Sequence, residues 1–349
     1  MLVKSIKLNN FRNYTNYQLE FDPHLNIIIG KNGVGKTNIL EAIIVISNVK
    51  SFRTLNDVDL IKKQTEYSRI VLNTQSDEYK LVLNKNGKSL FINNNSIKKT
   101  SEFIGKVNAV IFKPGDLELF VTSPSDRRRI IDVELSKISD TYIDSLTKYK
   151  KLLADKNNLL KQTNKDEILL SLINNSMIEP IKNIIRIRQE FFEEINKNIS
   201  NIYQLLSNTN SKIEIIYKKC SEVDKVEEEI ERSKDKDNYY QYATFGPHHD
   251  DYYFKIDNFE INTYASQGQK RMVLIAFKFA LVEYIKQITK ETPIILLDDI
   301  LSELDKNNQI RLLNILPKNS QTIITNTDIN NLNIVDKYKL IEIKEEQNA

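Results

Sequence analysis

Short stretches in which hydrophobic and polar residues alternate open the chain. Residues 2–8 and 16–21 alternate in this way, which is typical of strands that bury one face, and residues 9–14 are expected to connect them. Residues 25–29 form a continuous apolar run and predict a fully buried strand. From residue 36 to about 48 the apolar positions recur at helical spacing, so we expect a helix that packs one face against a sheet.

Alternation returns after this helix and predicts an antiparallel sheet, with a typical hairpin turn at Asn86-Gly87. The alternating runs cover residues 68–74, 79–84 and 89–93. Residues 107–112 predict another short buried strand, which Pro114 stops.

Helical periodicity dominates a long middle segment. Ser125 or Asp126 is a suitable N-cap, and from there to about residue 207 the chain contains one proline, Pro180, and no glycine. We therefore expect a helical insertion whose chain turns back near residues 162–167. Three further elements are expected after it, namely a strand at 212–217, a charged helix at about 221–236 and strand-forming sequence from Tyr239.

A glycine-rich loop lies between the buried strand and the first helix, with the spacing Gly-x-x-x-x-Gly-Lys-Thr over residues 30–37. Glycines allow successive backbone N–H groups to converge on phosphate oxygens at a helix N-terminus. Lys36 is then placed for the β- and γ-phosphates and Thr37 for Mg²⁺. Only 8 of the 349 residues are glycine and three of them fall in this loop, which favours a phosphate-binding loop over an ordinary glycine turn.

A second apolar run, residues 294–297, ends in Asp298 and Asp299. Asp298 is expected to hold Mg²⁺ beside Thr37. Asp299 points in another direction along the strand and could orient or deprotonate an attacking water. The two acids could instead cap a following helix, but the phosphate-binding loop earlier in the chain favours the first interpretation.

Polar residues also precede a later apolar helix that runs to about Lys290. Residues 266–269 read Ser-Gln-Gly-Gln, and small polar residues with a glycine at a helix start make a second anion-binding N-terminus. Because one site rarely needs two such helices from one chain, we expect a composite site in which this helix caps the γ-phosphate of ATP held by another subunit. A plain N-cap is the alternative.

The amino-acid composition and the net charge exclude few classes of protein. The chain has 50 basic and 47 acidic residues, a net charge of +3, so nucleic-acid binding would need local basic patches. One cysteine permits no internal disulfide, and three histidines leave little for a zinc site. The N-terminus lacks the apolar core of a signal peptide and no run has the length of a membrane span, so we expect a cytoplasmic protein without a structural metal.

The ordered set of motifs resembles the ABC-type ATPases of the SMC and DNA-repair group and, within that group, the RecF family of recombination mediators. Besides the phosphate-binding loop, the set comprises Ser-Gln-Gly-Gln, Leu-Leu-Asp-Asp and the Ser-Glu-Leu-Asp of residues 302–305. Further segments that carry the resemblance are residues 11–14, 51–54, 123–129 and 245–251.

The fold that this resemblance implies is α/β. It is a P-loop ABC-type ATPase head, with a mixed sheet and an antiparallel β lobe, that carries an inserted α-helical lobe. The implied domains are the N-terminal part of the head at 1–122, the helical insertion at 123–238 and the C-terminal part of the head at 239–349.

The resemblance also implies roles for individual residues. Lys36, Asp298 and Asp299 would be catalytic, and Thr37 and Asp298 would bind Mg²⁺. The residues implied to bind ATP are Arg12, Gly30, Lys31, Asn32, Gly33, Val34, Gly35, Lys36, Thr37, Asn38, Arg53, Ser266, Gln267, Gly268, Gln269 and Asp305. Of these, residues 266–269 would act in trans as the signature motif, and Asp305 belongs to the D-loop at the dimer seam.

The implied function is that of a mediator that dimerises on ATP, binds duplex DNA near single-strand gaps and helps to load RecA with RecR and RecO. ATP hydrolysis would be slow and stimulated by DNA. Two alternatives share the nucleotide motifs, namely the nucleotide-binding subunit of an ABC transporter and a minimal SMC-like structural head. The long helical insertion disfavours the first, and a chain of 349 residues leaves no room for the extended arms of the second.

The chain departs from the family pattern at three places. His249 stands where the family usually has an arginine. No glutamine-loop residue can be assigned near residues 113–116. Residues 326–328 read Asn-Thr-Asp at the position of the switch histidine of transporter ATPases.

Contact with DNA is expected to be mostly to phosphates, from basic residues of the insertion and the head. Arg127, Arg128 and Arg129 begin a helix and point in three directions, so at least one of them is expected to support the fold. Asp250 and Asp251 could suggest a nuclease metal pair, but adjacent acids on a strand face opposite sides, which favours a structural role or one close to the nucleotide.

Overall fold

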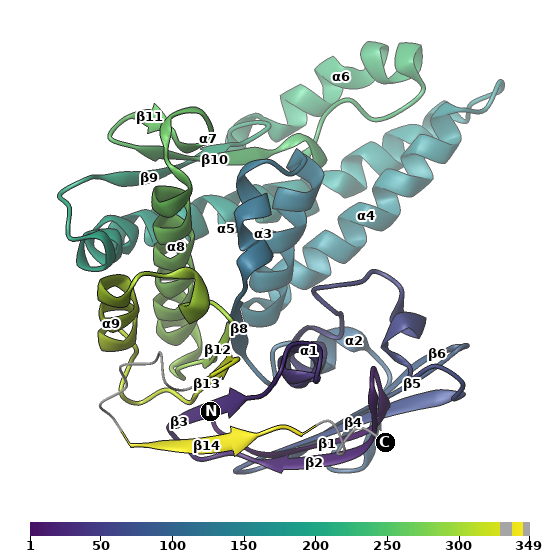
Figure 1. Ribbon diagram of the computed structural model, residues 1–349. Helices are drawn as coiled ribbons and strands as arrows, with labels where there is room; N and C mark the ends of the chain where they lie inside the picture. Colours follow the sequence, from purple (N-terminus) through teal and green to yellow (C-terminus); the bar gives the residue numbers. More distant parts are fainter. Residues whose placement is uncertain (329–336, 345–349) are drawn as a thin grey trace. The chain divides into compact units, whose positions relative to one another are not determined.

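The computed structural model describes residues 1–328 and 337–344, which fall into two compact units (Figure 1). Unit 1 contains residues 1–117, 201–209 and the described residues from 271 onward, and unit 2 contains residues 118–200 and 210–270. Segments from both ends of the chain therefore build unit 1 together. Residues 239–270, which were expected in the C-terminal part of the head, cluster with unit 2.

Unit 1 contains a five-stranded parallel sheet with the strand order β14-β3-β13-β12-β8. Its strands are β3 (Leu25–Ile29), β8 (Ala109–Phe112), β12 (Ile294–Asp298), β13 (Thr322–Asn326) and β14 (Tyr338–Glu342). β8, β12 and β13 are buried along their whole length, as expected for a parallel sheet covered on both faces. Because β13 pairs with both β3 and β12, the residues that follow β3 and β12 come together at the carboxyl edge of the sheet.

The second sheet of unit 1 is antiparallel, with the strand order β2-β1-β4-β5-β6-β7. Its strands are β1 (Val3–Phe11), β2 (Tyr14–Glu20), β4 (Tyr67–Thr74), β5 (Glu78–Asn84), β6 (Gly87–Ile92) and β7 (Asn95–Ile97). The α1 helix (Lys36–Asn48) contacts β8 and β12 of the parallel sheet and β4 and β5 of the antiparallel sheet (Figure 1). Residues 39–47 are all buried, so this helix buries more than the single face that its spacing predicted.

Unit 2 is built mainly from helices and carries a three-stranded antiparallel sheet of order β11-β10-β9. The helices are α3 (Pro124–Ile138), α4 (Asp140–Leu160), α5 (Glu167–Ser207) and α6 (Val226–Tyr240), and the strands are β9 (Ile213–Lys218), β10 (Asp251–Ile256) and β11 (Phe259–Glu260). The last residues of α5 belong to unit 1. The N-cap of α3 is Ser123, whose side chain accepts a hydrogen bond from the Asp126 N–H. The predicted cap at Ser125 or Asp126 is therefore wrong, because the helix already starts at Pro124.

The arginines at the start of α3 are divided between structure and surface. Arg127 donates to the two carboxylate oxygens of Asp251 at 2.8 and 2.7 Å. Arg128 donates to the carbonyl oxygen of Asp250 at 2.7 Å. Arg129 is exposed. Two of the three arginines therefore support unit 2, and both acids of the adjacent pair serve as partners inside the same unit.

Shorter elements and one long helix complete the described chain. They are η1 (Asp57–Leu60), α2 (Thr100–Phe103), η2 (Pro114–Phe120), η3 (Val223–Lys225), η4 (Pro247–His249), α7 (Ile261–Tyr264), α8 (Gln267–Thr289), η5 (Leu301–Glu303) and α9 (Lys306–Asn314). Across residues 1–328 and 337–344, no helix combines the length and the hydrophobicity that a membrane span requires.

Candidate nucleotide-binding site

The glycine-rich loop of residues 30–37 joins β3 to α1 at the carboxyl edge of the parallel sheet. Gly35 has a φ of +112°, in the left-handed region that favours glycine, and a Cβ at this position would lie 2.7 Å from the Tyr14 hydroxyl oxygen. Lys36 Nζ donates to two carbonyl oxygens of the same loop at 2.6 and 3.0 Å, which holds the ammonium group against the loop. Burial lowers the pKa of Lys36, and the nearby acids at the end of β12 oppose this change.

Residues 11–14 brace this loop. Asn13 Nδ2 donates to the Val34 carbonyl oxygen at 3.1 Å, and Asn13 Oδ1 accepts from Asn38 Nδ2 at 2.7 Å. Tyr14 is fully buried, its hydroxyl has no hydrogen-bond partner in the described part of the chain, and burial raises its pKa. The sequence indicated that this segment connects two strands and carries part of the family resemblance, whereas in the structure it also supports the conformation of the loop.

Asp298 lies beside the loop, at the end of β12. Its Oδ1 accepts from Thr37 Oγ1 at 2.9 Å and from Thr325 Oγ1 at 2.8 Å. Only 6% of Asp298 is exposed, and this burial raises the pKa of its carboxyl group, while the two threonine hydrogen bonds act in the opposite direction. The structure therefore brings together the hydroxyl and the carboxylate that the sequence predicted as neighbours.

Thr325 is a site residue that the sequence did not reveal. It lies in β13, the strand between β3 and β12, and its Oγ1 also accepts from the Asp299 N–H at 3.1 Å. Asp299 has a φ of +53°, and its Oδ1 is buried without a hydrogen-bond partner among the described residues. The one available signal for Thr325 was its place near the end of a parallel strand, where neighbouring strands also carry site residues.

The side chains at this edge line a polar cavity of about 280 Å³. The lining consists of Asn32, Gly33, Gly35, Lys36, Thr37, Asn38, Arg53, Asp298, Asp299 and Thr325. Of the two arginines that the resemblance implied for nucleotide binding, Arg53 lines the cavity. Arg12 instead pairs with the buried Glu41, with 2.6 Å between Arg12 Nη2 and Glu41 Oε1.

The Ser-Gln-Gly-Gln motif forms a reciprocal cap at the start of α8, in unit 2. Ser266 Oγ accepts from the Gln269 N–H at 3.2 Å, and Gln269 Oε1 accepts from the Ser266 N–H at 2.8 Å. Residues 266–269 are all exposed. Asp305 is likewise a cap, since its Oδ1 accepts from the Asn308 N–H at the start of α9 at 3.0 Å. Residues 266–269 thus form the helix cap that was the alternative interpretation of this motif, and they are also exposed.

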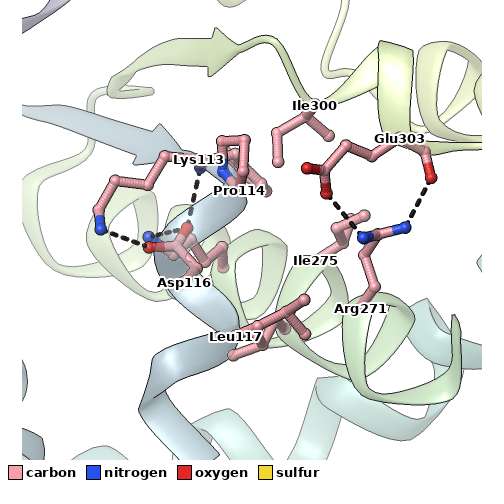
Figure 2. A pocket seen from close by; sticks show the side chains of 11 residues that line it. Lys113, Pro114, Asp116, Leu117, Arg271, Ile275, Ile300 and Glu303 are labelled. Atoms are coloured by element: carbon pink, nitrogen blue, oxygen red, sulfur yellow. Dashed lines mark hydrogen bonds and ion pairs between the residues drawn. The ribbon is translucent and has the colours of Figure 1, made fainter. Parts of the chain in front are cut away.

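A small pocket of unit 1 is lined by residues of α8 and by Ile300 and Glu303, which lie in the segment after β12 (Figure 2). Arg271 donates to the Glu303 carbonyl oxygen at 2.6 Å and pairs with Glu303 Oε2 at 2.8 Å. On the other side, Asp116 accepts from the Lys113 N–H at 3.0 Å and pairs with Lys278 Nζ at 2.9 Å. This is the region in which no glutamine-loop residue could be assigned. An acid paired with lysines occupies it.

The chain is similar to proteins of one family over nearly its whole length. The family model described as "RecF/RecN/SMC N terminal domain" matches residues 2–349. The DNA replication and repair protein RecF of Lachnoclostridium phytofermentans is 38% identical over 355 residues, with 98% of each chain covered. The chain belongs to the RecF family. Another RecF, from Clostridium perfringens strain 13, is 36% identical over 342 residues, covering 95% of this chain and 94% of its own length.

Solved structures of the RecF family share the fold. One, the recombination mediator protein RecF with ATP in the RecFOR pathway, has a TM-score of 0.89 and 31% identity, and covers 99% of this chain and 96% of that chain. An Smc head domain from Pyrococcus furiosus has a TM-score of 0.53 at 20% identity, which shows a likeness of fold alone. The predicted ABC-type head with a helical insertion is therefore confirmed, and RecF membership favours a DNA-repair mediator over a transporter subunit.

Proposed function

We propose that this chain is an ATP-binding DNA-repair mediator of RecF type that hydrolyses ATP slowly, in response to DNA. The observation that carries this proposal is the hydrogen bond between Thr37 and Asp298, which are 261 positions apart in the sequence. It joins the phosphate-binding loop to the acidic end of a second parallel strand, a pairing on which P-loop ATPases build Mg²⁺-nucleotide sites. The solved RecF relative with ATP supports the choice of nucleotide.

The residues at the sheet edge have complementary tasks in this proposal. The backbone N–H groups of residues 30–37 and the ammonium group of Lys36 bind the β- and γ-phosphates. Thr37 and Asp298 hold Mg²⁺, which suits hydroxyl and carboxylate oxygens. No group of three or more His, Cys, Asp and Glu side chains that could hold a metal exists within residues 1–328 and 337–344, so nucleotide oxygens and water would supply the other ligands. Asp299 orients the attacking water.

A second copy of the chain would complete the site. The exposed N-terminus of α8, with residues 266–269, would add its N–H groups to the γ-phosphate of ATP bound to the partner. ATP then joins the two copies, with Asp305 at the seam, and hydrolysis releases them. We propose that this dimer binds duplex DNA near single-strand gaps and acts with RecR and RecO to load RecA. The ATP-bound relative is named as a mediator in the RecFOR pathway, which supports this choice of partners.

Light scattering and ATPase assays on the same preparations test the proposal. The wild-type chain should dimerise with Mg²⁺ and ATP, and gapped duplex DNA should raise its turnover. Asp299→Asn should keep the dimer and lose about 100-fold or more in turnover. Ser266→Arg should bind nucleotide as a monomer, and Lys36→Met should lose nucleotide binding. A wild-type chain that stays monomeric with ATP and does not differ from Lys36→Met would overturn the composite site.

Contact with DNA is proposed to run mainly through phosphates, so affinity should fall steeply with salt. Arg129→Ala should reduce the slope of log affinity against log salt by about one, because it removes one exposed phosphate-binding charge. Arg127→Ala is the matched structural variant, since the Arg127 guanidinium is bound to Asp251, and it should instead lower the free energy of unfolding. An affinity that does not change between about 50 and 200 mM salt would contradict this model.

A further inference from the structure

A carboxylate is buried one helical turn beyond the phosphate-binding loop. Glu41 lies in α1, four positions after Thr37, and none of its side-chain surface is exposed. Arg12 donates from Nε and Nη2 to the two carboxylate oxygens at 2.9 and 2.6 Å. Arg53 donates from Nη1 to Oε2 at 3.3 Å, and Ser51 Oγ donates to Oε1 at 2.6 Å. Two arginines and a hydroxyl therefore share one buried carboxylate, which satisfies the rule that buried charges are paired and hydrogen-bonded.

The two arginines differ in how many of their donors the protein uses. Arg12 also donates from Nη1 to the Asp59 carbonyl oxygen at 2.9 Å, so all three of its guanidinium nitrogens bond to protein acceptors. Arg53 uses Nη1 for Glu41 and for Asn38 Oδ1, the latter at 2.8 Å, and 44% of its side chain is exposed. The structure shows no hydrogen-bond partner for Arg53 Nε or Nη2 within the described ranges. Arg12 thus fixes the carboxylate, while Arg53 keeps donors available in the lining of the cavity.

The backbone of Arg53 is tied to the same carboxylate. Ser51 Oγ donates to Glu41 and accepts from the N–H groups of Arg53 and Thr54 at 2.8 and 3.2 Å. Glu41 therefore anchors the main chain of Arg53 through Ser51 and shares the anchoring of its guanidinium group with Asn38. The cluster of Arg12, Arg53 and Glu41 carries two guanidinium charges against one carboxylate charge. Arg53 presents this surplus charge in the cavity lining, which also contains Lys36, Asp298 and Asp299, and a guanidinium group there suits an anionic ligand.

We propose that Glu41 is a positioning residue that holds the Arg53 guanidinium toward the phosphates of the bound nucleotide. The inference rests on the proposed function, which supplies the nucleotide. Neutralising Glu41 leaves two guanidinium groups without their shared counter-ion. The Arg53 guanidinium then keeps only its hydrogen bond to Asn38 Oδ1 and is held less firmly, whereas Lys36 is held by its own loop. Phosphate is the expected contact because the planar guanidinium fork matches its oxygens.

A double-mutant cycle on nucleotide affinity tests this proposal. Glu41→Gln, Arg53→Ala and the double variant are titrated, in Mg²⁺, with a ribose-labelled fluorescent ATP analogue and with its GTP counterpart. Each single change should weaken binding about tenfold, equivalent to about 1.4 kcal/mol. The double variant should bind no more weakly than Arg53→Ala, because Glu41 acts only through Arg53. If the two losses of affinity multiply in the double variant, the proposal is overturned. It is also overturned if only the ATP analogue binds more weakly, because a contact with phosphate must affect both nucleotides alike.

Matched variants separate this inference from the proposed function. Glu66→Gln changes an exposed carboxylate of the same unit and should alter neither affinity nor unfolding. If the wild-type chain binds no nucleotide, or binds it no better than Lys36→Ala, the proposed function fails. If wild-type binding is tight and the cycle is additive, only the role of Glu41 fails.

If Glu41→Gln does not fold, Ser51→Ala takes its place in the cycle as a milder change. Ser51→Ala removes the hydroxyl that links Glu41 to the Arg53 backbone and leaves the carboxylate paired with Arg12. It should weaken nucleotide binding several-fold, and the effect should vanish in the Arg53→Ala background. An effect that persists in that background would refute the proposal.

Discussion

The backbone of Asp299 offers a sharp test of how the site is built. This residue has a φ of +53° and is held there because its N–H donates to the Thr325 carbonyl oxygen at 3.3 Å and to Thr325 Oγ1 at 3.1 Å. The left-handed conformation costs a residue with a Cβ about 1–2 kcal/mol, and glycine avoids that cost. Glycine also raises the entropy of the unfolded chain, which offsets about 0.4–1 kcal/mol. Asp299→Gly should therefore be more stable than Asp299→Ala by about 0.5–1 kcal/mol.

Denaturant unfolding of the two variants measures this difference, because both lack the carboxylate and differ only in the backbone effect. The same pair of substitutions at Lys151, an exposed residue in the middle of α4, is the matched control. There alanine should be the more stable by about 1 kcal/mol. The reasoning is refuted if alanine is as stable as glycine at position 299 or if the two positions show the same sign. Both Asp299 variants should lose ATP turnover, and turnover at the wild-type rate would exclude this residue as the group that orients water.

Three further predictions concern neighbouring side chains. Thr325→Val keeps the shape of the side chain but removes its hydrogen bond to Asp298, so ATP turnover should fall about tenfold. Nucleotide affinity, measured in parallel, is the control. Tyr14→Phe removes a buried hydroxyl that has no partner in the described ranges, so thermal or denaturant unfolding should show a gain of about 1 kcal/mol, and a loss would reveal a hidden partner. Burial raises the pKa of Asp298, so the folded chain binds its proton more tightly than the unfolded chain does. The stability that the protonated Asp298 carboxyl group contributes is complete below its pKa in the unfolded chain and is lost as pH rises through its pKa in the folded chain. Asp298→Asn should remove this pH dependence of the free energy of unfolding.

The elements around the phosphate-binding loop were predictable because their signals are local. The strand at 25–29 and the helix at 36–48 agree with their predicted bounds, since a continuous apolar run and a helical period both arise within one element. The first two strands extend further than predicted, because β1 reaches Phe11 and β2 starts at Tyr14. Both aromatic side chains are fully buried, so packing extends the strands over residues whose polar neighbours suggested a loop.

The partners inside the site were less predictable because they depend on contacts between distant segments. Nothing near Thr325 in the sequence indicates that its hydroxyl will meet Asp298, since the contact follows from the pairing of β12 with β13. Glu41 reads as an ordinary polar residue in an apolar helix, and its two arginines lie 29 positions before it and 12 positions after it. A single sequence shows the residue types of such a network without showing its connections.

The order of the strands explains how a nucleotide site can be assembled from the two ends of a chain that carries a long insertion between them. β8 and β12 are adjacent in the parallel sheet although all of unit 2 lies between them in the sequence. The chain thus leaves the sheet and returns to it at neighbouring strands, so the insertion can exist without breaking the register of the sheet. The loop after β3 and the acids after β12 are then fixed by the pairing of both strands with β13. It follows that residues 30–37 alone can form the loop that we propose binds phosphate, whereas Thr37 and Asp298, which we propose hold Mg²⁺, meet only when the C-terminal strands have joined the sheet.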